Sequence, residues 1–331
     1  MKIFLTGGTG FIGSRLTERL LAEGHEPVLL LRNPARVSPG ATGITYVKGD
    51  IFSTSALDEG MKGCEWVFHL AAFTKPWSKD PSEAYRTNVT GTINVLEAAL
   101  ANGVKRVVMT STGGTIGCSN GNCVTCETTN PSPEFNTLYE KTKAEAEKLA
   151  VEYSEKGLPV VVVNPTRVFG PGRLSKSNSM TKIISLYRKG LWRIMPGDGN
   201  SVGNYVYIDD VVNGHILAAV KGRPGDRYIL GGENLSFREL FSSIGAVTGK
   251  KRLILPLPFP VMRSVVAVNT FLTGLTGMPP LITRDWLDKY MNNWIMSSDK
   301  AVTELGYTVT PFKEGVADTI KWLNTLKDGK R

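Results

Sequence analysis

The stretch "TGGTGFIG" (Thr6–Gly13) follows a short apolar run, "MKIFL" (Met1–Leu5), and leads into a segment with apolar residues at helical spacing. Its glycines, Gly7, Gly10 and Gly13, have the spacing G-x-x-G-x-x-G. A strand, a glycine turn and a helix in this order let the backbone approach a pyrophosphate closely, and the positive end of the helix dipole points at it. The arrangement therefore predicts a dinucleotide-binding loop rather than a glycine turn that merely packs a helix against a strand.

The composition predicts a globular protein. The chain has 331 residues, of which 41% are hydrophobic and 21% charged, enough for one large core or two unequal domains. The first apolar run is too short for a signal peptide, so we expect a cytoplasmic protein. The net charge of +9 comes from scattered lysines and arginines without a nucleic-acid motif. We interpret it as solvated surface and as help in binding a phosphorylated cofactor, and we expect a small-molecule substrate and no nucleic acid.

The cysteines and the longest apolar stretch do not change this interpretation. Cys118, Cys123 and Cys126 match part of an iron–sulfur spacing, but no fourth cysteine follows and Cys64 lies far upstream, so we expect reduced thiols and no metal. The stretch Phe259–Gly277 falls short of a membrane-spanning helix. We interpret it as a core or substrate-lining helix in preference to a helix on a membrane surface, and we expect at most weak contact with a membrane.

Strand and helix patterns alternate through the first half of the chain. Strands are expected near 2–6, 27–31, 44–48, 65–69, 105–111 and 159–164, and helices near 11–24, 54–62, 81–102 and 137–156. This alternation predicts a Rossmann-type α/β fold, a doubly wound parallel sheet with a smaller, mostly helical substrate domain. We expect the dinucleotide-binding domain at 1–167, with 205–221 returning to it, and the substrate domain at 168–204 and 222–331. Further helices are expected near 236–248, 260–276 and 311–326.

The segment "YEKTK" places Tyr139 and Lys143 one helical turn apart, so both side chains leave the same face of a helix. A phenol with a pKa of about 10 is a poor base at neutral pH, and a nearby ammonium is expected to lower that pKa. The pair predicts an acid/base. An exposed helical pair is the alternative, and the preceding dinucleotide loop argues against it.

The segment "RVVMTSTGGTIG" (Arg106–Gly117) brings hydroxyls to the end of a buried strand. Thr110, Ser111 and Thr112 follow a run of apolar residues, at the sheet edge where ligands of such folds bind. A hydroxyl there can donate a hydrogen bond to a substrate carbonyl oxygen.

Eight segments, in this order, resemble those of the extended short-chain dehydrogenase/reductase family, within the NAD-dependent epimerase/dehydratase superfamily. They are "TGGTGFIG" at 6–13, "GDI" at 49–51, "HLAA" at 69–72, "NVTGT" at 88–92, "TSTGG" at 110–114, "YEKTK" at 139–143, "NPTRVFGPG" at 164–172 and "YVYIDDVV" at 205–212. Among the members, the chain is similar to dihydroflavonol 4-reductase-like and 3β-hydroxysteroid dehydrogenase-like proteins. The resemblance implies an NAD(P)-dependent enzyme, often a homodimer through two long helices, here 81–102 and 137–156.

The resemblance also implies roles for individual residues. Tyr139 is the proton donor or acceptor, Lys143 binds the nicotinamide ribose and lowers the tyrosine pKa, and Thr112 polarises the carbonyl, with Ser111 as the alternative. Asp50 and Ile51 flank the adenine, Ala71 and Ala72 line the pyrophosphate side, Asn88 supports the lysine and a water, and Pro165 and Val168 pack on the nicotinamide. A helix-interior amide bonded to backbone is the alternative for Asn88. The cofactor site predicted in full comprises Gly7, Thr9, Gly10, Phe11, Ile12, Gly13, Arg32, Arg36, Asp50, Ile51, Leu70, Ala71, Ala72, Asn88, Thr110, Tyr139, Lys143, Pro165 and Val168.

Cofactor and reaction class are predicted from two further positions. The second strand ends in "LLLRNPAR", where Arg32 stands in place of the acidic residue of an NAD site and Arg36 follows, so NADP(H) is expected over NAD(H). Sugar-nucleotide enzymes of the family commonly have an arginine shortly before the "YVYIDD"-like segment, where this chain has Gly203 and Asn204. Four other cations nearby in the sequence could substitute for it: Arg173, Lys176, Arg188 and Arg193. We therefore expect hydride transfer between NADPH and a ketone or aldehyde of an apolar small molecule. A nucleoside-diphosphate-sugar epimerase or dehydratase with tightly bound NAD is the alternative, and the intact tyrosine–lysine pair argues against a non-catalytic sensor.

Overall fold

The computed structural model describes residues 1–33, 43–75, 77–78, 80–129, 137–172, 178–276 and 283–328. Its main sheet is parallel, with the strand order β10-β6-β5-β4-β1-β2-β3. The strands are β1 (Lys2–Thr6), β2 (Glu26–Leu31), β3 (Thr45–Lys48), β4 (Trp66–His69), β5 (Arg106–Thr110), β6 (Val160–Pro165) and β10 (Arg227–Leu230). The six expected strands are confirmed, whereas the four-residue β10 was not predicted from the sequence.

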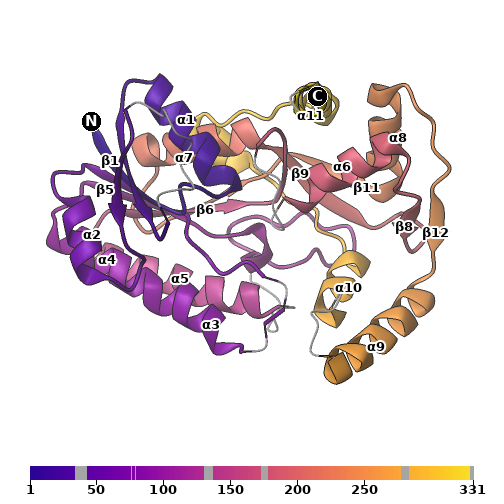
Figure 1. Ribbon diagram of the computed structural model, residues 1–331, viewed down its shortest axis with the longest axis horizontal. Coiled ribbons are helices and arrows are strands. Elements are labelled where there is room, and N and C mark those ends of the chain that lie inside the picture. The colour runs from indigo at the N-terminus through magenta and orange to yellow at the C-terminus, as the bar shows by residue number, and fades with distance from the viewer. Residues whose placement is uncertain are drawn as a thin grey trace.

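Helices cover both faces of this sheet, which confirms the doubly wound architecture (Figure 1). One face packs against α2 (Thr54–Met61), α4 (Gly91–Ala101) and α5 (Leu138–Glu155), and the other against α1 (Phe11–Ala22) and α7 (Ile208–Lys221). The expected helix at 81–102 is interrupted: α3 (Ser82–Tyr85) leads through a π-helical turn, η2 (Arg86–Thr90), into α4. The strands supply fully buried Val, Ile, Leu and Phe to both cores, as expected of a parallel sheet covered on both faces.

The remaining elements form a second core beside the carboxyl edge of the sheet. Its strands are β7 (Arg167–Phe169), β9 (Val202–Tyr207) and β11 (Glu233–Ser236) in one small sheet, and β8 (Ile194–Pro196) and β12 (Leu255–Leu257) in another. The helices of this part of the chain are α6 (Ser179–Lys189), α8 (Phe237–Thr248), α9 (Phe259–Thr276), α10 (Arg284–Met291) and α11 (Phe312–Asp328). Short helical turns, η3 (Gly113–Thr115) and η4 (Ala301–Leu305), complete the described elements. Aromatic side chains from β7, β9, α8 and α11 fill this core.

The helix α9 was expected as a core or substrate-lining helix, and the first of these expectations is wrong. Of its described side chains only Val266 is buried, and the helix lies at the margin of the molecule beside α10 (Figure 1). No described helix is both long and apolar enough to cross a bilayer.

Candidate active site

The glycine loop is built for close approach of backbone to backbone. Gly7 has a φ of 72°, and a Cβ added there would lie 2.7 Å from the backbone nitrogen of Ala71. A Cβ on Gly13 would lie 2.2 Å from the carbonyl oxygen of Gly7. Helix α1 begins after Gly10 without a side-chain cap and without an acidic residue in its first turn. Its first N–H groups and its positive dipole end therefore fit a pyrophosphate.

Buried hydrogen bonds beside the glycine loop join β1, β4 and α4. The Thr6 hydroxyl lies 2.7 Å from Nδ1 of His69 and accepts a hydrogen bond from the backbone of Ala71, while Nε2 of His69 lies 3.0 Å from the Thr92 hydroxyl. Burial and the charge of Lys143 lower the pKa of His69 to about 3. His69 is thus a neutral structural residue between β4 and α4.

The hydroxyls of Thr110, Ser111 and Thr112, at the carboxyl end of β5, have different hydrogen-bond partners. Thr110 lies 2.9 Å from His215 of α7, on one face of the sheet. Ser111 donates to Glu147 of α5, on the other face, and is 4% exposed. The hydroxyl of the half-buried Thr112 accepts from the backbone of Gly114, which leaves its own proton to be donated elsewhere. Of the two alternatives in the sequence, the geometry therefore favours Thr112 over Ser111 as donor to a substrate oxygen.

Glu147 is a buried residue that sequence reasoning missed. Its Oε1 accepts from Thr115 at 2.6 Å and from Asn164 at 2.7 Å as well as from Ser111, and its Oε2 lies 3.3 Å from Nη1 of Arg227. The signal was present in the sequence, because Glu147 follows Lys143 by four residues, as Lys143 follows Tyr139. This carboxylate joins the carboxyl ends of β5 and β6 and the first residue of β10 to α5.

Tyr139 and Lys143 stand near the start of α5, as expected. Burial raises the pKa of Tyr139 above that of a free phenol, and the carboxylates of Glu140 and Glu147 add to the rise. Lys143 is 1% exposed, and burial lowers its pKa to about 8 against the raising effect of Glu147. The expected lowering of the tyrosine pKa by Lys143 is therefore wrong for this structure, because burial dominates.

An ion pair between Glu140 and Lys289 stabilises the start of α5. Glu140 closes a capping box with Thr137, and its Oε1 lies 2.5 Å from Nζ of Lys289 in α10. A Cβ on Gly114 would lie 2.6 Å from the same carboxylate, so the turn that carries Thr112 packs directly against α5. The guanidinium of Arg167 in β7 lies nearby and donates to the hydroxyl of Tyr205. Neither Lys289 nor Arg167 was expected near the site.

The other predicted cofactor residues lie around the same edge. Asn88 is 1% exposed, accepts from the backbone N–H of Phe73 at 2.7 Å and donates to the Thr142 hydroxyl at 2.9 Å, so it joins the end of β4 to α5. Asp50 accepts from the backbone of Phe52, and Ile51 is 6% exposed. The remaining side chains include buried ones (Phe11, Pro165), half-buried ones (Thr9, Ile12, Leu70, Ala71, Ala72, Val168) and the exposed Arg32. Arg36 lies outside the described residues.

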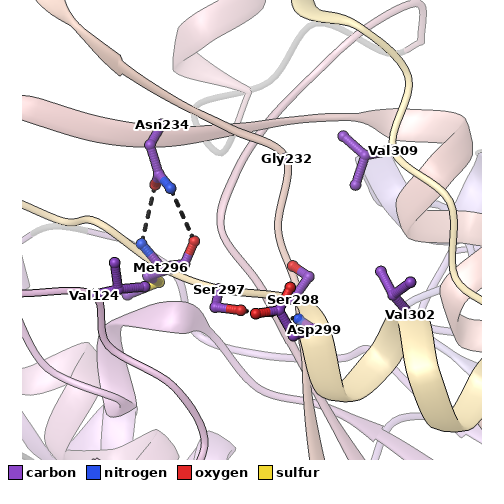
Figure 2. A pocket seen from close by; sticks show the side chains of 9 residues that line it. All are labelled: Val124, Gly232, Asn234, Met296, Ser297, Ser298, Asp299, Val302 and Val309. Atoms are coloured by element: carbon purple, nitrogen blue, oxygen red, sulfur yellow. Dashed lines mark hydrogen bonds between the residues drawn. The ribbon is translucent and has the colours of Figure 1, made fainter.

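A separate cavity of ≈ 290 Å³ contains none of the predicted site residues. It is lined by residues such as Val124, Ser298 and Val309, and Asn234 bonds to the backbone of Met296 at its wall (Figure 2). Cys118, Cys123 and Cys126 are free thiols, and no cluster of three or more metal-binding side chains occurs in the ranges that the structure describes.

Comparison with known proteins agrees with this geometry. Residues 3–231 match the model of the NAD dependent epimerase/dehydratase family, and the chain belongs to that family. It is 31% identical to a putative dihydroflavonol 4-reductase of Synechocystis sp. over 96% of this chain and 93% of the relative. The crystal structure of gox2253 has a TM-score of 0.83 at 31% identity, covering 98% of both chains. MoeE5 in complex with UDP-glucuronic acid and NAD has a TM-score of 0.77 at 27% identity, covering 98% of this chain and 100% of that one.

The protein is accordingly an NAD(P)-dependent enzyme of the extended short-chain dehydrogenase/reductase type. Proteins named as reductases and proteins named as sugar-nucleotide epimerases or dehydratases both occur among those similar to it.

Proposed function

We propose that the protein reduces a ketone or aldehyde of a largely apolar small molecule with NADPH. The observation that carries the proposal is the convergence of three features at one sheet edge. These are the glycine loop packed on Ala71, the Thr112 turn packed on Glu140, and the buried Lys143 one turn after Tyr139.

Thr112, Tyr139 and Lys143 have different roles in the proposed reaction. A bound nicotinamide dinucleotide supplies or accepts the hydride. Thr112 donates a hydrogen bond to the substrate carbonyl oxygen, and Tyr139 transfers a proton to that oxygen as the alkoxide forms. Because burial raises the pKa of Tyr139, the phenol holds its proton until the developing alkoxide, a stronger base, removes it. Lys143 holds the ribose hydroxyls and, by its charge, favours the phenolate left behind.

The cations available for a diphosphate favour the reductase over the epimerase. Asn204 is 2% exposed and is bonded to Thr166, Gly232 and Asn234, so it belongs to the packing of the second core. Arg188, a possible substitute for the usual arginine, is 9% exposed and donates to Asn324. Arg173 and Lys176, two other candidates, lie outside the described residues. Arg193, the fourth candidate, is exposed and donates to the carbonyl oxygen of Gly190. Lys289 and Arg167, near the start of α5, interact with Glu140 and Tyr205. A diphosphate is strongly disfavoured in an apolar pocket unless a cation reaches it.

The test is a comparison of substrate classes. We expect aromatic or terpenoid ketones and aldehydes to oxidise added NADPH, and UDP- or dTDP-sugars neither to turn over nor to raise the melting temperature. Epimerised product without net cofactor consumption, together with a thermal shift by a UDP-sugar, would make the epimerase the better assignment. Tightly held NAD on the purified protein would point the same way.

Cofactor choice is a separate prediction. Arg32 is exposed at the end of β2, where a guanidinium can pair with the 2′-phosphate of NADPH. We expect tighter binding of NADPH than of NADH, and we expect Arg32→Ala to erase most of the difference in Kd measured by fluorescence titration. Arg19→Ala, on the exposed surface of α1, is the control. Equal affinities of the unmodified protein for both cofactors would refute the prediction.

The alanine variants of Thr112 and Ser111 are expected to change different quantities, turnover in the first and the free energy of unfolding in the second. Thr112→Ala is expected to lower kcat by about 100-fold, the effect of removing one donor to a developing oxyanion, and Thr112→Ser should restore most of it. Ser111→Ala removes a donor from the buried Glu147 and should lower the free energy of unfolding by about 1–3 kcal/mol. A larger loss of kcat in Ser111→Ala, at unchanged stability, would reverse the assignment.

We also propose that residues 1–167 and 205–221 form the dinucleotide-binding domain, and that two copies of the protein associate through α4 and α5. Both proposals start from the sequence. The packing of α7 on β5 and β6 supports the return of 205–221 to the first domain.

A further inference from the structure

An apolar stripe runs along the exposed side of α9. Val261, Val265, Val268, Leu272 and Leu275 follow one another at three- and four-residue spacing, which places them on one helix face. Such a stripe normally faces a core, yet these side chains are 46%, 55%, 60%, 47% and 70% exposed. Phe271, beside the stripe, is 68% exposed.

Further exposed apolar side chains occur in the two strands next to the start of the helix. Leu255 of β12 pairs with Ile194 of β8, and these side chains are 52% and 44% exposed. Leu191 and Leu253, just before them in the chain, are 69% and 71% exposed. Where α9 begins, a Cβ on Gly197 would lie 2.5 Å from the ring of Phe259, so the helix start packs on the end of β8. We call this margin, formed by β8, β12 and α9 and visible at the right of Figure 1, the α9 edge.

Basic residues outnumber acidic ones around the α9 edge, where the acidic side chains are Asp198, after β8, and Asp285 and Asp288 of α10. From Lys250 to Arg284 the sequence contains Lys250, Lys251, Arg252 and Arg263 besides Arg284, and no acidic residue. Lys250, Lys251 and Arg263 are exposed. Apolar side chains flanked by lysine and arginine are the composition of helices that lie in the interface of an anionic membrane.

We propose that the α9 edge binds the surface of a bilayer containing anionic lipids, with α9 lying in the interface and the basic residues beside the headgroups. A second copy of the chain fits less well, because a two-fold contact through the α9 edge would bring the cations of both copies together. The proposal does not rest on the reductase assignment.

The sequence pattern had favoured burial of this helix. The structure instead leaves its stripe without a covering element in the part of the chain that it describes, and puts the single buried valine, Val266, on the other side.

Vesicle flotation tests the proposal with a matched pair of variants. The protein should float with vesicles of phosphatidylcholine and phosphatidylglycerol, bind pure phosphatidylcholine vesicles more weakly, and be released by salt. Val268→Asp on α9 should lower the partition coefficient by about tenfold or more. Val220→Asp is the control, because Val220 of α7 is 57% exposed, against 60% for Val268. Lys251→Gln should reduce binding to the anionic vesicles only.

Three results would overturn the proposal. They are no flotation of the unmodified protein with the anionic vesicles, equal losses in Val268→Asp and Val220→Asp, or a dimer in light scattering that Val268→Asp dissociates, which would assign the edge to a second copy. Far-UV circular dichroism melts of both variants show that each is folded. Turnover of a water-soluble ketone, measured separately, distinguishes failure of this proposal from failure of the reductase assignment.

Discussion

Tyr139→Phe should lose turnover by about 100-fold or more, the effect of removing a general acid, while Kd for NADPH changes little. The phenylalanine keeps the ring and its packing near the start of α5 and removes only the hydroxyl. The loss is expected in kcat, because the proton moves in the reaction and not on binding. Stopped-flow measurement of NADPH oxidation under single-turnover conditions separates this step from product release.

Tyr153→Phe is the matched control. Tyr153 lies on the same helix, four turns after Tyr139, and its hydroxyl bonds to Glu97 of α4. Its variant should keep turnover within about twofold, because it removes only this part-buried hydrogen bond between α5 and α4. Comparable turnover of Tyr139→Phe and the unmodified protein would remove Tyr139 from the mechanism and leave Lys143 without its proposed partner.

The sheet could be predicted because its strands are local patterns. The buried apolar runs at β1, β2, β4, β5 and β6 alternate with helical segments, and for such a chain the right-handed crossover leaves few topologies. The last strand, β10, lies after the alternating strand and helix patterns of the first half of the chain, so no flanking pattern marks its four residues. The short strands β7, β9 and β11 likewise lie outside that alternation.

A distinction between local pattern and tertiary contact applies to the site residues. Tyr139, Lys143 and Glu147 share one face of a helix, so their proximity follows from spacing alone. Which of Ser111 and Thr112 faces a substrate depends on where Glu147 lies, and that contact joins two distant segments. The direction of the tyrosine pKa was missed for a related reason: the spacing shows the nearby ammonium, but only the fold shows how deeply both groups are buried.

Lys143→Met should stabilise the ligand-free protein at neutral pH while lowering its turnover. The folded-state pKa of Lys143, about 8, lies below the ordinary value of 10.5, so the unfolded chain binds this proton more tightly. The stability linked to Lys143 is therefore present in full above pH 10.5 and is lost as the pH falls through 8. At pH 7 the cost of keeping the ammonium buried is about 3 kcal/mol, and at pH 9.5 about half of that. Methionine keeps the apolar stem without the charge.

Guanidinium unfolding of both proteins at the two pH values measures this difference, because His69, whose pKa the charge of Lys143 helps to lower, is neutral in the folded protein at both. Lys141→Met, at an exposed position of the same helix, should change the free energy of unfolding by less than about 1 kcal/mol at either pH. A Lys143→Met protein that is less stable than the unmodified one at pH 7 would mean that attraction to Glu147 outweighs the burial of the ammonium. A gain in stability that fades toward alkaline pH, together with the loss of turnover, would show that the enzyme keeps a destabilising charge at this position because the reaction needs it.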